Sequence, residues 1–168
     1  MILPLLTATA VLLGSLLSYG MAMGLLVQIV VRLIRSGYTE RGFWTDVFVM
    51  MIVTLVTVAA HLTQIALWAA ALLMSGEIST FETAFYYSAQ NYTALGYGDI
   101  VLSERWRLLG PLEAINGLLL FGLSTGVMFA VMGRLIANRV HLQLGQPGEA
   151  AVNPESGGSG SKRVTEPL

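Results

Sequence analysis

Three long stretches of the sequence are almost free of charge, and they constrain the fold more than any other feature. Residues 1–31 and 47–76 contain no Asp, Glu, Lys or Arg, and residues 108–133 contain only Glu113. The hydrocarbon core of a bilayer is about 30 Å thick, so roughly 20 apolar helical residues cross it. Because backbone groups in lipid must be paired within the segment, each stretch should be helical. The sequence predicts membrane-spanning helices at about 5–34, 44–75 and 107–139.

The overall composition excludes several classes of protein. Of the 168 residues, 55% are hydrophobic and 11% are charged, whereas a soluble domain carries about 25% charged residues. The net charge of −1 argues against a nucleic-acid-binding surface. The absence of cysteine excludes a thiol nucleophile and cysteine metal ligands, and two histidines are too few for a histidine metal cluster. The expected surrounding is a lipid bilayer, and no soluble partner is implied.

The basic residues set the predicted orientation. They cluster between the first two helices and at the end of the third: Arg32, Arg35, Arg41, Arg134 and Arg139. Because cytoplasmic segments carry an excess of Lys and Arg, the 35–43 loop and the C-terminus should be cytoplasmic. We expect a multi-pass protein of the plasma membrane, as in a bacterial inner membrane. Residues 140–168 become rich in Gly, Ser and Pro, which predicts a disordered cytoplasmic tail.

The segment between the second and third predicted spans is too polar to cross the membrane. Ser79 and Glu82 have the spacing of a capping box, with Ser79 as the N-cap, and a short helix is predicted over 79–92. Gly96 and Gly98 then break the helical pattern. A short helix followed by a glycine-rich strand between two spans is typical of a re-entrant pore loop, which is tolerated where it lines a water-filled cavity.

The motif Leu95-Gly96-Tyr97-Gly98-Asp99 resembles the selectivity filter of potassium channels, whose signature is Thr-Val-Gly-Tyr-Gly. Tyr86 and Tyr87 stand where many family members carry an aromatic pair, and Trp106 has the spacing seen in bacterial two-helix channels. The stretch 106–137 resembles the inner helix. The resemblance covers residues 44–139, so residues 1–34 form an additional N-terminal helix outside the two-helix pore unit.

This resemblance implies an all-α membrane protein with three transmembrane helices, a re-entrant pore helix and a filter loop at 93–99. One chain carries one such loop, and a filter needs about four, so a cyclic homotetramer is expected. The implied function is passive, potassium-selective conduction rather than enzyme catalysis. K⁺ is the permeant ion and no organic cofactor is implied. The ion-binding carbonyls belong to Leu95, Gly96, Tyr97 and Gly98, with Ala94 at the inner end.

Three positions depart from or refine the family pattern. Ala94 stands where the family has a threonine hydroxyl, so we expect three good ion sites and a poor innermost one. Gln90 stands where an acidic residue is common, and it can donate a hydrogen bond to Asp99. Tyr97 should point away from the pore and pack on the pore helix against Tyr86 or Tyr87. Ala94 also motivates an alternative function, a weakly selective cation channel, and a non-conducting membrane scaffold or regulatory subunit is a further alternative.

A set of residues around the loop is expected to support the filter: Tyr86, Tyr87, Gln90, Thr93, Asp99, Trp106, Glu113 and Asn116. Thr93 should not line the pore. Glu113 is the exceptional member, because an ionisable group in a span is costly and usually faces protein or water. It is a buttress behind the filter, a proton sensor or a buried structural acid, and Asn116 shares its helix face. Gly117 and Gly122 are candidates for a gating hinge or for close helix packing.

The second span carries a polar stripe at three- or four-residue spacing: Thr54, Thr57, His61, Gln64 and Trp68. We expect it to form a hydrogen-bonded helix contact, and a titrating role for His61 is the alternative. No span has regularly spaced arginines, so a voltage sensor is not expected. The first helix could flank the pore unit, pack on a neighbouring subunit or lie partly in the membrane interface, and its charge-free length favours a span.

Overall fold

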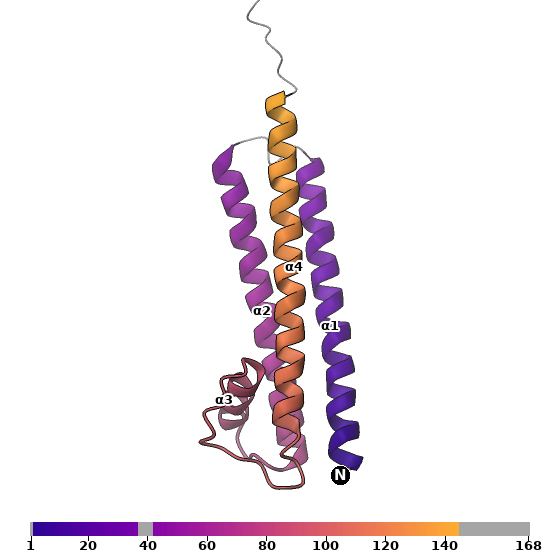
Figure 1. The fold of residues 1–168 in the computed structure, drawn as a ribbon, viewed down its shortest axis with the longest axis vertical. Coiled ribbons are helices and arrows are strands. Elements are labelled where there is room, and N and C mark those ends of the chain that lie inside the picture. The colour runs from indigo at the N-terminus through magenta and orange to yellow at the C-terminus, as the bar shows by residue number, and fades with distance from the viewer. Residues whose placement is uncertain (1, 37–41, 145–168) are drawn as a thin grey trace, which may run out of the picture.

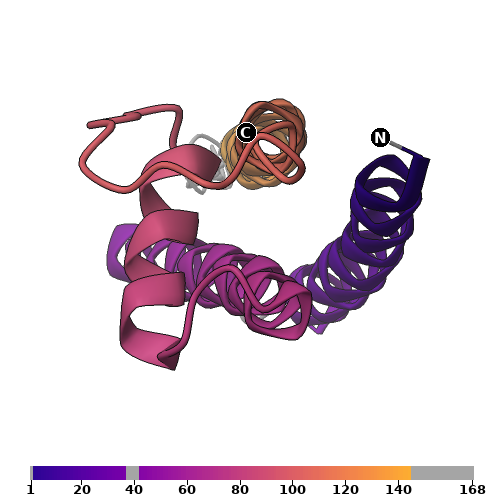
Figure 2. The same cartoon turned by 90° about the horizontal axis from the view of Figure 1, so that it is seen from below.

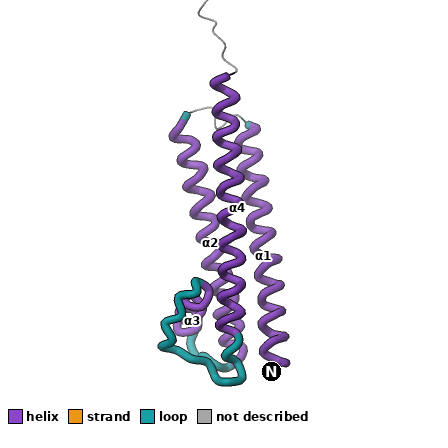
Figure 3. Tube along the Cα trace, in the orientation of Figure 1, coloured by secondary structure: helices purple, strands orange, loops and turns teal. Residues whose placement is uncertain are grey.

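The computed structural model describes residues 2–36 and 42–144, where all regular structure is helical (Figures 1 and 3). In chain order the helices are α1 (Ile2–Arg35), α2 (Phe43–Ser75), α3 (Phe81–Tyr92) and α4 (Leu109–Leu144). Three of them contain apolar segments of 32, 33 and 33 residues, each long enough to cross a membrane. The three predicted spans are therefore confirmed, and the protein is a multi-pass membrane protein.

The three long helices lie side by side, and α3 is set against one edge of this bundle (Figure 1). The end of α1, the start of α2 and the end of α4 share one end of the bundle, whereas α3 and the loop after it lie at the other (Figure 1). Seen along the bundle, α3 contacts α2 and α4 on the side away from α1 (Figure 2). The chain therefore returns to the side it left between α2 and α4, as the orientation argument requires.

Two helix starts differ from the prediction. α3 begins at Phe81 because Thr80, rather than Ser79, is the N-cap: its side chain accepts a hydrogen bond from the Thr83 amide at 3.3 Å. α4 begins at Leu109 rather than at residue 107. A tight turn precedes it, in which the Ser103 carbonyl accepts from the amides of residues 106 and 107, each at 2.9 Å. Both differences arise from local hydrogen bonds that compete with the helix ladder.

The end of α4 is also later than predicted. The helix continues to Leu144, so the tail predicted from residue 140 begins too early. Residues 145–168 of that tail, and residues 37–41 of the predicted 35–43 loop, lie outside the described residues. At the opposite end of the bundle, α2 ends at Gly76, which adopts a left-handed φ of 77° and donates its amide to the Leu73 carbonyl at 3.1 Å. Such a C-cap favours glycine because a Cβ is strained there.

The core lies along the line where α1, α2 and α4 meet. α1 packs against both other long helices of its own chain, burying Tyr19, Met23 and Leu26. From α2 and α4, Trp68 and Leu120 are fully buried in the same cluster. Within one chain, α1 thus packs along α2 and α4 as the third helix of the bundle and does not lie across its end.

Polar side chains tie the bundle at both ends. Where α2 begins and α4 ends, Arg139 pairs with Asp46, with Nε and a terminal nitrogen 2.6 and 2.5 Å from the same carboxylate oxygen. At the other end, the Glu77 carboxylate accepts from the amide and the hydroxyl of Ser103, both at 2.8 Å. This second contact joins the α2–α3 connection to the loop that precedes α4.

We predict that Asp46→Asn lowers the free energy of unfolding by about 1 kcal/mol, since the ion pair is only partly buried. Thermal unfolding of the protein in detergent would measure the loss, which should shrink at high salt. Arg134→Gln is the matched control, because Arg134 lies on the same end of α4 and forms no salt bridge among the described residues. Equal losses in the two variants would contradict a specific role for the Asp46–Arg139 pair.

Candidate functional site

The loop that follows α3 has an unusual backbone. φ is positive at Ala94 (57°), Gly96 (54°) and Gly98 (74°), whereas Leu95 and Tyr97 between them have ordinary negative φ. A regular strand points successive peptide groups to opposite sides. A segment in which the sign of φ alternates from residue to residue instead turns successive peptide groups toward one side. The segment 94–98 is therefore built to gather its polar backbone atoms, and Figure 3 shows it as an irregular loop beside α3.

Backbone conformation, not space, explains the two glycines. A Cβ at Gly96 or Gly98 would meet no atom within 4 Å, but the left-handed region costs other residues roughly 1–2 kcal/mol. Ala94 bears that strain as the one non-glycine with positive φ among the described residues. Nothing in the sequence marks this position, because alanine is not enriched in left-handed conformations.

The beginning of the loop is folded back onto the last turn of α3. The Ala94 amide donates to the Asn91 carbonyl at 2.8 Å, and the Leu95 and Gly96 amides donate to the Gln90 carbonyl at 2.8 and 3.3 Å. These bonds over-determine the local backbone, which is the condition under which a strained φ persists. Thr93 sits at the junction with its hydroxyl donating to the Ala89 carbonyl at 2.7 Å.

The far end of the loop is held to α3 through Asp99. One carboxylate oxygen accepts from the Tyr86 hydroxyl at 2.9 Å, and the other accepts from Gln90 Nε2 and the Ile100 amide, both at 3.1 Å. Tyr86 and Gln90 are one helical turn apart and share a face. The expected Gln90–Asp99 hydrogen bond is therefore present, and the Tyr86 contact adds a donor that the sequence did not indicate.

These hydrogen bonds change the pKa values of Asp99 and Tyr86. The hydrogen bond from Tyr86 is the largest cause that lowers the pKa of Asp99, and Gln90 and backbone amides act in the same direction. The same bond raises the pKa of the Tyr86 hydroxyl. Asp99 is thus an ionised acceptor and Tyr86 a protonated donor over the neutral pH range, which is the pairing the geometry needs.

The side chains of the loop face outward within a single chain. Tyr97 is 67% exposed and Leu95 is 55% exposed, so Tyr97 does not pack on α3 as predicted. Behind the loop lies a cavity of about 190 Å³, with room for several waters at about 30 Å³ each. It is lined by Tyr87, Gln90, Asn91, Gly96, Gly98, Ile100, Val101, Leu102 and Arg107.

Glu113 contacts α3 from behind. It is fully buried, and the Ser88 hydroxyl donates a short hydrogen bond to its Oε1 atom. Its other oxygen has no hydrogen-bond partner within residues 2–36 and 42–144, and a buried carboxylate with one donor is costly while ionised. The contact with Ser88 fits the buttress alternative, because it joins α4 to the middle of α3.

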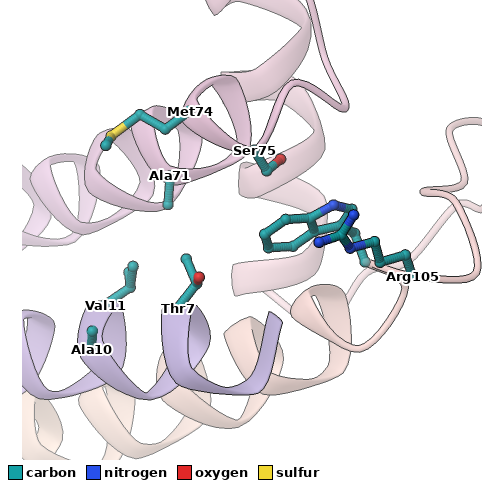
Figure 4. A pocket seen from close by; sticks show the side chains of 8 residues that line it. Thr7, Ala10, Val11, Ala71, Met74, Ser75 and Arg105 are labelled. Atoms are coloured by element: carbon teal, nitrogen blue, oxygen red, sulfur yellow. The ribbon is translucent and has the colours of Figure 1, made fainter. Parts of the chain in front are cut away.

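Two residues predicted to support the loop lie elsewhere. Asn116 shares a face with Glu113, but its Nδ2 atom donates to Ser15 of α1 at 2.8 Å. Trp106 lines a cleft of about 510 Å³ between α1 and α2, with Arg105 over its ring at 5.9 Å (Figure 4). The other lining residues are Thr7, Ala10, Val11, Ala71, Met74 and Ser75. Both departures reflect α1, whose packing partners the sequence did not reveal.

Gly117 is a point of close approach. A Cβ there would lie 1.9 Å from the Tyr92 carbonyl oxygen and 2.8 Å from its carbon, whereas a Cβ at Gly122 would meet nothing within 4 Å. Gly110 is a second such point, where a Cβ would lie 2.9 Å from Asn91 Oδ1. Of the two readings of the α4 glycines, close packing therefore describes Gly117.

We predict that Gly117→Ala destabilises the protein by about 1–3 kcal/mol, the usual cost of overpacking. The Tyr92 carbonyl belongs to the backbone and cannot rotate away from the added methyl group. Gly122→Ala is the matched control on the same helix, and it should be neutral or stabilising by up to about 1 kcal/mol through helix propensity. Thermal unfolding in detergent separates the two. A Gly117→Ala protein as stable as the control would show that the Tyr92 contact is not tight.

We predict that Tyr86→Phe lowers the stability of the protein near neutral pH and makes that stability less dependent on acid pH. Because the folded pKa of Asp99 lies below its unfolded value of about 3.9, its stabilising effect is present above that value and is lost as pH falls through the folded pKa. Removing the Tyr86 donor raises the folded pKa toward the unfolded value, so the variant is less stable near neutral pH and loses less stability than the wild type as the pH falls.

Unfolding midpoints measured from pH 7 to pH 3 would test this, with Tyr87→Phe as the matched control on the neighbouring residue. Tyr87 is itself buried and its hydroxyl lies beside Asn91 rather than Asp99. Superimposable acid profiles for Tyr86→Phe and Tyr87→Phe would exclude the hydrogen bond as the cause.

Comparison with known proteins adds an independent observation. Residues 60–134 match a protein family described as Ion channel, and the matched segment runs from the middle of α2 through α3 and the 93–108 loop into α4. Neither the curated proteins nor the solved structures contain a match to this chain. The matching family consists of channels rather than enzymes, and α1 precedes the matched segment. Over residues 60–134, a little under half of the chain, the sequence is thus similar to an ion channel family.

Proposed function

We propose that the protein is the subunit of a potassium-selective channel, in which four copies surround one pore and K⁺ flows passively through the 94–98 loops. The observation that carries this proposal is the alternation of φ at Ala94, Gly96 and Gly98, directly after the pore helix. Potassium must lose its hydration shell to enter a narrow pore, and rings of backbone carbonyls replace the lost ligands. A backbone that gathers its carbonyls on one side supplies such rings.

The anchoring of the loop supports the same proposal. Its inner end is bonded to the Gln90 and Asn91 carbonyls, and its outer end is held by Asp99 between Tyr86 and Gln90. A loop attached to one helix at both ends keeps its carbonyls in place when an ion enters or leaves. Preorganised ligands of this kind lower the cost of exchanging water for protein.

The exposure of the loop side chains favours assembly. Lipid-facing residues of α1, α2 and α4 are exposed in any membrane helix, so they do not discriminate. Tyr97 and Leu95 lie outside the spans, yet they are 67% and 55% exposed in one chain. Neighbouring copies around a cyclic axis would cover them, and about four loops are needed to surround an ion.

Ala94 makes the innermost ion site different from the other three. With only a carbonyl at the innermost position, that ion site lacks a hydroxyl ligand, so three stronger sites and one weaker site are expected. The same residue is the reason to keep a weakly selective cation channel as the second candidate. Because Arg32, Arg35, Arg134 and Arg139 lie at the ends of α1 and α4, we infer that the 35–43 loop and the C-terminus are on the cytoplasmic side of a plasma membrane.

We predict that the purified protein is a tetramer and carries K⁺ at least about tenfold faster than Na⁺ in liposomes. Gly96→Ala should lower the flux, because a second alanine with a left-handed φ, beside Ala94, adds strain to the loop, while the control Gly122→Ala should retain it. Ion density at high K⁺ should be weakest at the innermost site.

The other results would each overturn a different part of the proposal. Equal K⁺ and Na⁺ flux would identify a weakly selective channel, and a tetramer without flux would identify a scaffold or regulatory subunit. A protein that remains monomeric in lipid would exclude a shared filter. Innermost ion density equal to that of the other sites would remove the role given to Ala94.

A further inference from the structure

A buried cluster of polar side chains joins α1 to the end of the pore helix. It consists of Tyr19 on α1, His61 on α2, Tyr92 at the end of α3 and Ser124 on α4, and we call it the His61 cluster. We propose that Tyr19, acting through His61, is a positioning residue for the filter, so that α1 is a working part of the pore. This inference rests on the proposed channel function.

The contacts within the His61 cluster are close and buried. His61 Nδ1 lies 2.8 Å from the Tyr92 hydroxyl, and Nε2 lies 3.1 Å from Ser124 Oγ and 3.4 Å from the Tyr19 hydroxyl. None of the four side chains is more than 8% exposed. The Phe121 ring covers the imidazole, with centroids 4.5 Å apart. In lipid such bonds are maintained because no water competes for them.

His61 is the intermediate between α1 and α3. The backbones of these two helices do not approach each other within the described residues, because α3 lies on the opposite side of α2 and α4 (Figure 2). The imidazole contacts Tyr19 with one ring nitrogen and Tyr92 with the other. A change at Tyr19 can therefore reach the end of α3 through a single side chain.

One arrangement of protons gives both ring nitrogens of His61 a partner, with Nε2–H shared between the oxygens of Ser124 and Tyr19. The Ser124 hydroxyl donates to the Leu120 carbonyl at 2.9 Å, so its oxygen is free to accept from His61 Nε2–H. Nδ1 then accepts from the Tyr92 hydroxyl, and the ring is neutral. We assign this tautomer from the hydrogen-bond network. The imidazole is thereby held at a fixed angle, so a displacement of Tyr19 also displaces Tyr92.

Tyr92 is the residue through which the cluster acts on the filter. It is the last residue of α3, and the strained loop begins two residues later at Ala94. Its hydroxyl is bound by His61, while its carbonyl packs against the backbone of Gly117. Because the loop amides are bonded to the carbonyls of the preceding turn, a shift of Tyr92 would move the inner carbonyls of the proposed filter.

A second buried group fixes α1 one turn away. Asn116 Nδ2 donates to the Ser15 hydroxyl at 2.8 Å, the Ser15 hydroxyl donates to Gln64 Oε1 at 2.6 Å, and Gln64 Nε2 donates to Ser18 Oγ at 3.1 Å. Apolar contacts between helices in lipid specify register weakly, whereas polar bonds specify it well. This group sets the height and rotation at which α1 presents Tyr19, four residues after Ser15.

The test compares Tyr19→Phe and Tyr92→Phe with the control Thr57→Val in the intact tetramer. Each variant removes one hydroxyl, and Thr57 is buried on the same helix as His61 but bonds only to its own helix, at the Val53 carbonyl. We expect both tyrosine variants to lower the K⁺/Na⁺ permeability ratio several-fold and the control to leave it unchanged. The double variant should be no worse than the stronger single one, because both act through His61.

Hydrogen exchange separates failure of this inference from failure of the proposed function. The amides of Ala94, Leu95 and Gly96 should exchange several-fold faster in Tyr19→Phe than in Thr57→Val, whichever ion the channel selects. If the wild-type protein does not select K⁺, the proposed function fails while the exchange result still decides on the His61 cluster. If Tyr19→Phe matches Thr57→Val in exchange, or additive effects appear in the double variant, the inference is overturned.

Discussion

Every polar group at membrane depth must find its partner inside the protein, and the rest of this structure depends on that requirement. In the three spans the backbone satisfies itself by forming helices. The polar side chains of the spans then have to meet one another, and they do so in the layers around Gln64 and His61. The 93–99 loop is the exception, since its backbone is irregular at a place where it is bonded to α3 and faces outward from one chain.

α3 is held from several directions, each by a different kind of contact. Glu113 bonds to Ser88 in its middle, and Gly117 packs against the carbonyl of Tyr92 at its end. Asp99 returns from the loop to the face that carries Tyr86 and Gln90. Together with the packing of α2 and its His61 contact to Tyr92, these contacts hold α3 and the loop as one unit between α2 and α4.

The sequence allowed the large elements to be predicted because the distribution of charge is a long-range signal. A charge-free stretch as long as 47–76 predicts a membrane-spanning helix, and Gly96 and Gly98 predict an interruption of helical structure. Local boundaries were less predictable, since Ser79 and Thr80 are adjacent and equally able to cap a helix. The Gln90–Asp99 hydrogen bond was predictable because the residues are nine apart and belong to a recognisable motif.

Contacts between distant segments could not be predicted in the same way. Ser15 and Asn116 are 101 residues apart, and only the packing of α1 brings them together. The polar stripe on α2 did indicate a hydrogen-bonded helix contact, which is confirmed for His61 and Gln64. Thr54, included in that stripe, is instead exposed and bonds to its own helix at the Met50 carbonyl. The left-handed Ala94 had no sequence signal at all.

The contrast between Gly117 and Gly122 bears on how α4 can move. Bending at Gly117 would separate α4 from the Tyr92 carbonyl and so disturb the end of α3, whereas a Cβ at Gly122 would meet no described atom within 4 Å. At the far end, Arg139 ties α4 to Asp46. A change in the angle of α4 beyond Gly117 would therefore involve both α1, which packs along it, and the Asp46–Arg139 pair at its far end.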